Sequence, residues 1–336
     1  MDPVVALRRI AFLLERQLAE THRIKAYRKA ADRLEQVGPA EVGRLAAVGQ
    51  LTTLADVGPK TALVAQQALD GAVPEYLAEL TSAAGPLVDG GAEVRSWIKG
   101  DLHTHSIESD GGSPIEHMAA AAIETGLEYM VLTDHSPRLT VANGLSADRL
   151  RDQIGRVKAL NAELAPFRIL TGIEVDILDG GALDQEADLL AELDVVVASV
   201  HSKLRMPAEQ MTRRMVHAIA NPHVDVLGHC TGRLIMGGRG TRPESTFDAE
   251  IVFEACRRFD VAVEINSRPE RRDPPTRLLE LAVETGCLFA VDTDAHAPGQ
   301  LDFLDYGCAR VADLELGRER IVNTMAADDL LAWTRT

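Results

Sequence analysis

Apolar residues recur at helical spacing along the first 90 residues of the chain. The recurring positions are Ile10, Leu13, Leu14 and Leu18, followed by Tyr27, Ala30, Ala31 and Leu34. Such spacing is typical of amphipathic helices, and no alternating run of β-branched residues interrupts it. We therefore expect a small all-α domain over residues 1–90, joined to the rest of the chain by the Gly/Ala-rich stretch at residues 85–92.

The pattern changes near Trp97, where short apolar runs begin to alternate with helical segments. The runs lie at residues 98–102, 129–132, 169–170, 194–198, 224–227, 261–265 and 288–291. The clearest helical segments between them cover residues 113–125, 146–164 and 246–258. Repeated alternation of strand and helix favours parallel strands wrapped by helices. The sequence thus predicts an α/β domain over residues 97–336, closed or nearly closed into a barrel.

Composition narrows the class of protein without choosing a function. The chain is 46% hydrophobic, so it can bury a core, but no apolar run approaches the roughly 20 residues of a membrane span. It does not open with a basic segment followed by an apolar stretch, and its four scattered cysteines favour free thiols. These features predict a cytoplasmic protein without membrane contact. The formal charge of −16 argues against a general nucleic-acid coat.

Histidines and carboxylates gather where the predicted strands end. Six of the ten histidines end or closely follow an apolar run, and the third run ends instead near Glu174. These histidines are His103, His105, His135, His201, His229 and His296. Because the carboxyl ends of the strands of a parallel barrel share one face, we expect these side chains to meet there.

This set of side chains points to metal chemistry. Imidazole and carboxylate ligands suit zinc, manganese and iron, and clustered metals are a common means of hydrolysing phosphate esters. A single pair such as His103 and His105 is usually incidental, and one histidine at a strand end is usually structural. Six at five of the seven predicted strand ends, with Glu174 and Asp294 beside them, would be costly to bury without metal. We expect two or three divalent metal ions, with manganese preferred for activity.

Six segments resemble, in order, the motifs of the PHP (polymerase and histidinol phosphatase) family. They are His103-Thr104-His105-Ser106, Thr133-Asp134-His135-Ser136, Gly172-Ile173-Glu174, Ser199-Val200-His201-Ser202, Gly228-His229 and Asp294-Ala295-His296. The resemblance covers residues 98–336 and implies a distorted seven-stranded β/α barrel of the TIM type with a trinuclear metal site.

The same resemblance implies which residues hold each metal. The first metal would be bound by His103, His105, Glu174 and Asp294. The second would share Glu174 and add His201 and His229. The third would be bound by Asp110, His135 and His296.

Within the family, the chain resembles the C-terminal PHP domain of bacterial family X DNA polymerases. Residues 228–233, 264–267 and 269–273 carry this likeness, and residues 26–31 and 54–62 resemble the small helix-hairpin-helix domain of those polymerases. In that domain, backbone amides of the hairpin grip a DNA phosphate, a role that suits a helix N-terminus. The likeness implies DNA contacts by Lys25, Arg28, Lys29, Gly58 and Lys60.

Three departures from the polymerase pattern limit what the resemblance implies. Asp56 stands at the first hairpin glycine, where its carboxylate would repel a phosphate. Val64 stands where lyase-active relatives have a nucleophilic lysine, so we expect no lyase activity. The polymerase palm with its paired aspartates is missing between the two predicted domains, so we expect no polymerase activity.

Further polar residues are candidates for the reaction itself. Lys203, Arg233 and Arg271 follow strand ends and could bind a substrate phosphate, with structural salt bridges as the alternative. Asp134 is expected to orient a metal ligand, with simple surface exposure as the alternative. Catalysis is expected to depend on Glu174, Asp294, His105 and Asp134.

The favoured hypothesis is a metal-dependent phosphoesterase, specifically a manganese-dependent 3′→5′ DNA exonuclease acting in repair, with abasic-site cleavage as an additional activity. A hydroxide bridging two metals would attack the phosphorus in line. One alternative is a small-molecule phosphatase of the histidinol-phosphate or nucleotide type, which the charge of −16 favours. Another is a non-catalytic module associated with repair. The sequence gives no sign of a required protein partner.

Overall fold

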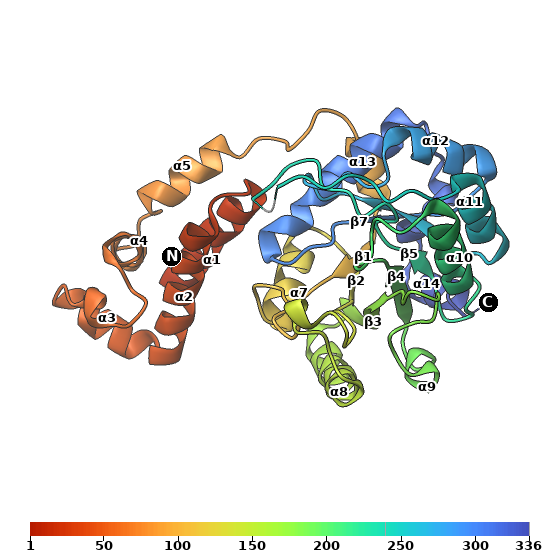
Figure 1. Cartoon of the computed structure of the whole chain (residues 1–336). Helices are drawn as coiled ribbons and strands as arrows, with labels where there is room; N and C mark the ends of the chain where they lie inside the picture. Colours follow the sequence, from red (N-terminus) through yellow and green to blue (C-terminus); the bar gives the residue numbers. More distant parts are fainter. Residues whose placement is uncertain (239, 336) are drawn as a thin grey trace. The chain divides into compact units, whose positions relative to one another are not determined.

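The computed structural model describes residues 1–238 and 240–335, which divide into two compact units, Met1–Pro86 and Leu87–Thr336. The first unit is all helical, as the apolar spacing predicts (Figure 1). Its elements are α1 (Pro3–Arg16), α2 (Thr21–Val37), α3 (Pro39–Ala47), the 3-10 helix η1 (Leu51–Thr53), α4 (Pro59–Leu69) and α5 (Glu75–Ala83). Helix α1 begins where the Asp2 carboxylate accepts hydrogen bonds from the amides of Val4 and Val5. Its buried face, which includes Ile10 and Leu14, packs on α2 and α4.

The second unit is a nearly closed barrel of seven parallel strands in the order β1 to β7, wrapped by helices (Figure 1). The strands are β1 (Gly100–Thr104), β2 (Tyr129–Leu132), β3 (Arg168–Asp176), β4 (Val195–Ser199), β5 (Val226–Leu227), β6 (Ala262–Asn266) and β7 (Phe289–Asp292). Each of the seven apolar runs contributes one strand, so the predicted α/β barrel is confirmed.

Helices connect the strands and cover the outside of the barrel (Figure 1). They are α6 (Ala92–Trp97), α7 (Ile115–Glu124), α8 (Ala147–Leu164), α9 (Ala187–Leu190), α10 (Ala208–Ile219), α11 (Ala249–Arg258), α12 (Thr276–Thr285), α13 (Leu304–Asp313) and α14 (Ala327–Trp333). Among the described residues, no helix combines the length and the apolar character needed to cross a membrane.

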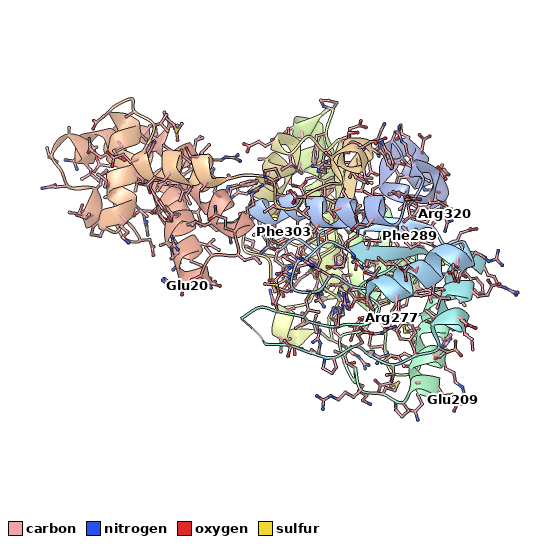
Figure 2. The ribbon with its side chains drawn as sticks, turned by 90° about the horizontal axis from the view of Figure 1, so that it is seen from above. Glu20, Glu209, Arg277, Phe289, Phe303 and Arg320 are labelled. Carbon is pink, nitrogen blue, oxygen red and sulfur yellow. The ribbon has the colours of Figure 1, made fainter. Side chains whose placement is uncertain are left out.

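The amino-terminal half of the barrel interior is apolar. Val131, Val197 and Val226 from β2, β4 and β5 form one buried cluster with Leu330 of α14, which closes that end. Burial of each aliphatic side chain contributes roughly 1.5–3 kcal/mol to folding. On β7, the Phe289 ring is also buried, and the guanidinium of Arg320 lies over it at 5.7 Å (Figure 2). This packing leaves the carboxyl half of the barrel for polar side chains.

A β-bulge in β1 changes which side chains point inward. Asp101 pairs with Met130 and Thr104 pairs with Leu132, so β1 has one residue more than β2 over this stretch. Such a bulge re-aims the side chains that follow it. As a result the side chains of two successive residues, Leu102 and His103, both point into the barrel. Leu102 lies in the apolar cluster, and His103 Nε2 lies 3.4 Å from Glu174 Oε2 on β3.

Side chains close the seam between β7 and β1. The Asp292 carboxylate accepts a 2.9 Å hydrogen bond from the Leu102 amide, and the Asn323 side chain bonds Gly100 O and Val291 O at 3.0 Å each. Asn323 lies in the 3-10 helix η5 (Val322–Thr324). Thr293, directly after β7, also donates from its amide and its hydroxyl to the Asp101 carboxylate of β1, and Thr104 and Ala295 form an isolated bridge. The barrel is therefore closed by polar groups at the seam.

The carboxyl group of Asp225, which is buried at the amino-terminal end of β5, makes the stability of the fold depend on pH. Asp225 precedes β5, and its Oδ2 accepts a 2.7 Å hydrogen bond from the Val196 amide. Burial raises the pKa of Asp225 to about 8, whereas the unfolded chain should have a value of about 4. Between those pH values the folded state binds more protons, so the free energy of unfolding falls as pH rises.

We expect Asp225→Asn to remove this dependence, because the amide keeps an accepting oxygen and carries no charge. In denaturant titrations, the stability advantage of the variant should grow between pH 5 and pH 8 by at most about 1.4 kcal/mol per pH unit and then level off. A difference that does not change with pH would show that Asp225 is ionised in the folded protein.

Candidate metal centre

The strand ends bring all nine predicted ligand residues into one cluster, in which Asp110 is exposed, His201 and His296 are partly buried and the other six are buried. Their nitrogen and oxygen atoms form four overlapping groups, and the atoms within each group all lie within 4.8 Å of one another. Together the groups contain His103, His105, Asp110, His135, Glu174, His201, His229, Asp294 and His296. At least one of these residues lies on, or within three residues after, each of six of the seven strands. They meet because the carboxyl ends of parallel strands share one face.

The carboxylate of Glu174 on β3 lies at the centre of the cluster. Its Oε1 is 2.8 Å from His229 Nε2 and 3.2 Å from His201 Nε2. Its Oε2 is 2.7 Å from His135 Nδ1 and 3.4 Å from His103 Nε2. Burial opposes ionisation of this carboxyl, but the surrounding imidazoles outweigh burial and hold the pKa of Glu174 well below its ordinary value. Glu174 is therefore ionised and can contribute both oxygens to metal ligation.

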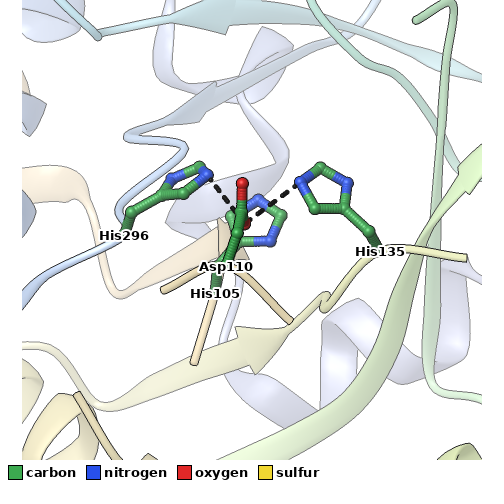
Figure 3. Close-up of side chains that lie close together, drawn as sticks. All are labelled: His105, Asp110, His135 and His296. Atoms are coloured by element: carbon green, nitrogen blue, oxygen red, sulfur yellow. Dashed lines mark ion pairs between the residues drawn. The ribbon is translucent and has the colours of Figure 1, made fainter. Parts of the chain in front are cut away.

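A second group lies at the mouth of the cluster. Asp110 lies between two imidazoles, with its Oδ1 3.4 Å from His135 Nε2 and 3.2 Å from His296 Nε2 (Figure 3). The His105 ring stacks on the His135 ring, with 4.5 Å between their centroids, and its centroid lies 4.2 Å from that of the His296 ring. Burial lowers the pKa of His105 well below its ordinary value, and the neighbouring His296 and His135 lower it further. A neutral His105 has a lone pair available for a metal.

The polar atoms of the cluster are better suited to binding metal ions than to forming hydrogen bonds with one another. Many of them are buried and have no hydrogen-bond partner, although they lie at ion-pair distances. These atoms are His103 Nε2, both ring nitrogens of His105, His201 and His229, His135 Nδ1 and both carboxylate oxygens of Glu174. Buried polar groups without partners are costly and rare in native proteins. Divalent ions such as manganese, zinc or iron would satisfy this mixture of imidazole and carboxylate donors.

Asp294 is held in place by an arginine that could also meet a substrate. The Asp294 backbone has φ of 52°, an unusual conformation for a non-glycine residue that is often found at functional sites. Its Oδ2 accepts a 3.0 Å hydrogen bond from Arg271 Nε. Arg271 is 9% exposed, and its Nη1 is buried without a partner. Arg271 thus lies at the cluster with one donor still available.

The two other predicted phosphate-binding residues already have partners. Lys203 forms an exposed ion pair with Asp179. Arg233 donates from Nε to Arg271 O at 3.0 Å, and a second nitrogen bonds Arg272 O. Arg233 therefore holds the loop that carries Arg271, and the contact of Lys203 or Arg233 with a substrate stays a prediction.

Asp134 anchors a loop beside the cluster. Its carboxylate accepts hydrogen bonds from the Ser106 amide at 2.8 Å, from Gln153 Nε2 at 2.6 Å and from the hydroxyls of Ser106 and Ser109. These bonds fix the segment between His105 and Asp110, both predicted ligands. That Asp134 orients a ligand, and that it takes part directly in catalysis, both stay predictions.

The residues that sequence reasoning missed at the cluster include Arg268 and Asp176. Arg268 Nη1 donates to Asp294 O at 2.7 Å and lies 3.0 Å from His296 Nδ1. Asp176 Oδ1 lies 3.4 Å from His201 Nδ1 and accepts its backbone amide. Asp176 could have been found, because it stands two residues after Glu174 on the same strand. Nothing in the sequence distinguishes Arg268 from the neighbouring arginines.

The predicted DNA-binding residues of the first unit differ in their surroundings. Arg28 pairs with the buried Glu15, with Nε 2.6 Å from Oε1. Lys29 Nζ lies 3.6 Å from Asp56, which has φ of 61° at the hairpin. Gly58 caps α4, and its backbone N–H donates to Thr61 Oγ1 at 3.0 Å. Lys25 lies on α2.

A cavity of about 710 Å³ opens beside this hairpin within the first unit. Gly58 and Lys60 line it, together with Val64 and the stacked rings of Tyr27 and Tyr76. Val64 gives the cavity an apolar wall at the position where lyase-active relatives have lysine. The hairpin glycine and lysine thus border a cavity, and their contact with DNA stays a prediction.

Comparison with known proteins gives matches for both units. A sequence model of the PHP domain matches residues 101–268, half of the chain. A model of a helix-hairpin-helix domain matches residues 2–72.

Relatives over most of the chain include a polymerase and several phosphatases. The chain is 42% identical over 238 residues to a Bacillus subtilis protein named DNA polymerase/3′-5′ exonuclease PolX, a match of 71% of this chain and 41% of that protein. It is 29% identical over 235 residues to a probable phosphatase of Thermoanaerobacter, a match of 67% of this chain and 89% of that protein. Hydrolysis of phosphoester bonds is common to these names, and the prediction of a phosphoester hydrolase is confirmed as a class.

A solved structure of lower similarity is the histidinol phosphate phosphatase of Lactococcus lactis, with zinc, L-histidinol and phosphate bound. It is 20% identical, covers 65% of this chain and 94% of its own, and aligns with a TM-score of 0.46. The match of the PHP model, together with the relatives, identifies the family: the chain belongs to the PHP domain family.

Proposed function

We propose that this chain is a metal-dependent phosphoesterase that removes nucleotides from the 3′ ends of DNA, with manganese as the working ion. The observation that carries the proposal is the gathering of nine candidate ligand residues, six of which have buried side-chain nitrogen or oxygen atoms without hydrogen-bond partners. A helix-hairpin-helix domain in the same chain and the exonuclease name of the Bacillus subtilis relative support DNA as the substrate.

The residues of the chain divide the work between ligation and substrate binding. Divalent ions held by the nine residues would activate water and stabilise charge on phosphoryl oxygens. Glu174 joins the groups, because each of its oxygens faces different imidazoles. Arg271 Nη1, buried without a partner, would donate to a non-bridging oxygen of the scissile phosphate. Asp294 keeps that guanidinium in place through the bond from Arg271 Nε.

The first unit would guide the DNA through its hairpin. The backbone amides at the start of α4, next to Gly58 and Lys60, would bind a phosphate of the duplex. Asp56 opposes this contact by its charge, and Lys29 only partly compensates it, because exposed ion pairs are weak. We therefore propose a low affinity for duplex DNA, with the barrel supplying recognition of the end. Cleavage at abasic sites and a role in DNA repair are part of the same proposal.

A small-molecule phosphatase is the second candidate function. The 29% identical relatives named probable phosphatases are matched over nearly their whole length by this chain, whereas the Bacillus subtilis protein is matched over 41%. The formal charge of −16 also disfavours a polyanionic substrate away from the metal cluster. This function would use the same ligands and would leave the first unit without a part in catalysis.

Glu174→Gln should abolish metal loading and hydrolysis together, because the amide removes the charge on which five imidazoles converge. Loss of a residue that only orients a ligand costs 10- to 100-fold, so loss of this ligand should lower the manganese-dependent rate by roughly 100-fold or more. Metal content after dialysis and initial rates are the measurements, and Asp225→Asn is the matched buried control. Full activity and full metal content in Glu174→Gln would exclude the assigned centre.

The substrate is tested by giving the purified chain Mn²⁺ and two substrates in parallel, a 5′-labelled primer–template DNA and a panel of phosphomonoesters. We expect a ladder of products shortened from the 3′ end, absent with Glu174→Gln. Release of phosphate from small esters while the DNA stays intact would instead establish the phosphatase.

Replacing Asp56 tests the hairpin. In the full chain carrying Glu174→Gln, so that DNA is not cut, Asp56→Asn should raise affinity for duplex DNA about fivefold, the effect of removing roughly 1 kcal/mol of charge repulsion at the surface. Asparagine tolerates the positive φ, so the turn should be preserved. Fluorescence anisotropy at low and moderate salt measures the change, which salt should reduce. Equal affinities at low salt would show that the hairpin does not face the DNA.

A further inference from the structure

Strand β6 is the one strand of the barrel that supplies none of the nine ligand residues, and yet its carboxyl end lies inside the cluster. Glu264 and Asn266 on this strand have no exposed surface. They belong to the segment 264–267 that resembles the family X relatives, for which the ligand set gives no role. A buried carboxylate is costly unless it is well paired, so its contacts should indicate what it does.

Both carboxylate oxygens of Glu264 contact residues of the metal centre. Oε1 lies 2.6 Å from His103 Nδ1. Oε2 accepts the backbone N–H of His229 and lies 3.2 Å from Asn266 Nδ2. Asn266 Nδ2 lies in turn 3.4 Å from Asp294 Oδ2. One side chain and its neighbour therefore contact three ligand residues, on β1, after β5 and after β7.

The contact with His103 selects which ring nitrogen faces the metals. A carboxylate can only accept a hydrogen bond, so His103 Nδ1 carries the proton and donates it in the hydrogen bond to Glu264. The lone pair is then on Nε2, which is buried without a hydrogen-bond partner and lies 3.4 Å from Glu174 Oε2. Carboxylates that accept from the second nitrogen of a ligand histidine fix its tautomer and ring orientation.

We propose that Glu264 is a positioning residue of the metal centre. It presents His103 Nε2 to one metal and, through the His229 amide, fixes the segment that carries a ligand of another. This inference rests on the proposed metal-dependent function. It differs from a purely structural role for Glu264, because the loss of Glu264 should weaken metal binding even in a barrel that remains folded.

Glu264→Gln is the variant that tests this role, because an amide has one accepting oxygen where the carboxylate has two. If that oxygen accepts from His103, the NH₂ group faces the His229 N–H, so one contact must be lost. We expect the full-length variant to bind Mn²⁺ roughly 10- to 100-fold more weakly than the wild-type chain. Metal retained against graded chelator concentrations is the readout, with circular dichroism as the check on folding. Asp225→Asn, a buried carboxylate at the opposite end of the barrel, should bind Mn²⁺ like wild type.

The outcomes separate this inference from the proposed function. A wild-type chain that binds no metal would overturn both. Wild-type binding with equal Mn²⁺ affinity in Glu264→Gln would overturn the positioning role alone. Weakened binding, with a hydrolysis rate that recovers toward wild type as Mn²⁺ is raised, supports it. A rate that stays low at full metal occupancy would overturn it in favour of direct participation in the reaction.

Two further measurements apply if Glu264→Gln does not fold. Glu264→Asp keeps the charge but is one methylene shorter, so it should also lose Mn²⁺ affinity, and wild-type affinity in a folded Asp variant would overturn the role. In the zinc-loaded wild-type chain with ¹⁵N-labelled histidine, His103 should show a protonated Nδ1 and a metal-bound Nε2. The opposite assignment would contradict the inference without any variant.

Discussion

The Glu174 carboxylate draws five imidazoles to within 4 Å of its two oxygens, and the rest of the barrel is arranged to make that possible. One negative charge cannot satisfy so many buried nitrogens by hydrogen bonding. The cluster is therefore a set of donors that a group of cations would complete. Arg271 and Arg268 add positive charge on the Asp294 side, where a phosphate ester could be bound.

The fold separates this polar cluster from the source of its stability. The amino-terminal half of the barrel is filled by aliphatic side chains and closed by α14, while the carboxyl half holds the ionisable residues. Two local irregularities connect the halves. The bulge in β1 turns His103 inward directly after Leu102 enters the apolar core, and Asp292 and Asn323 close the seam beside it. Glu264 then extends the centre to β6, the strand without a ligand.

The alternation of apolar runs and helical segments allowed the barrel to be predicted from the sequence alone. The nine candidate ligand positions came from the histidines and carboxylates at the strand ends together with the resemblance to the PHP family, and the structure brings these residues together. What it could not provide were contacts that depend on register or on distant pairing. The inward turn of His103 depends on a bulge, and Arg28 pairs with a glutamate thirteen positions earlier on another helix. Arg233, Arg268 and Arg271 cannot be told apart from the sequence. Only the structure shows that Arg268 and Arg271 contact Asp294, whereas Arg233 holds the loop that carries Arg271.

We propose that the nitrogens and oxygens without hydrogen-bond partners around Glu174 are metal ligands. A crystal structure of the chain grown with Mn²⁺, with data collected at the manganese absorption edge, tests this most directly. We expect two or three anomalous peaks inside the cluster, with the Glu174 carboxylate bridging two of them and His103 bound through Nε2. Absence of peaks there, with water molecules bonded to the imidazoles and to Glu174, would contradict it.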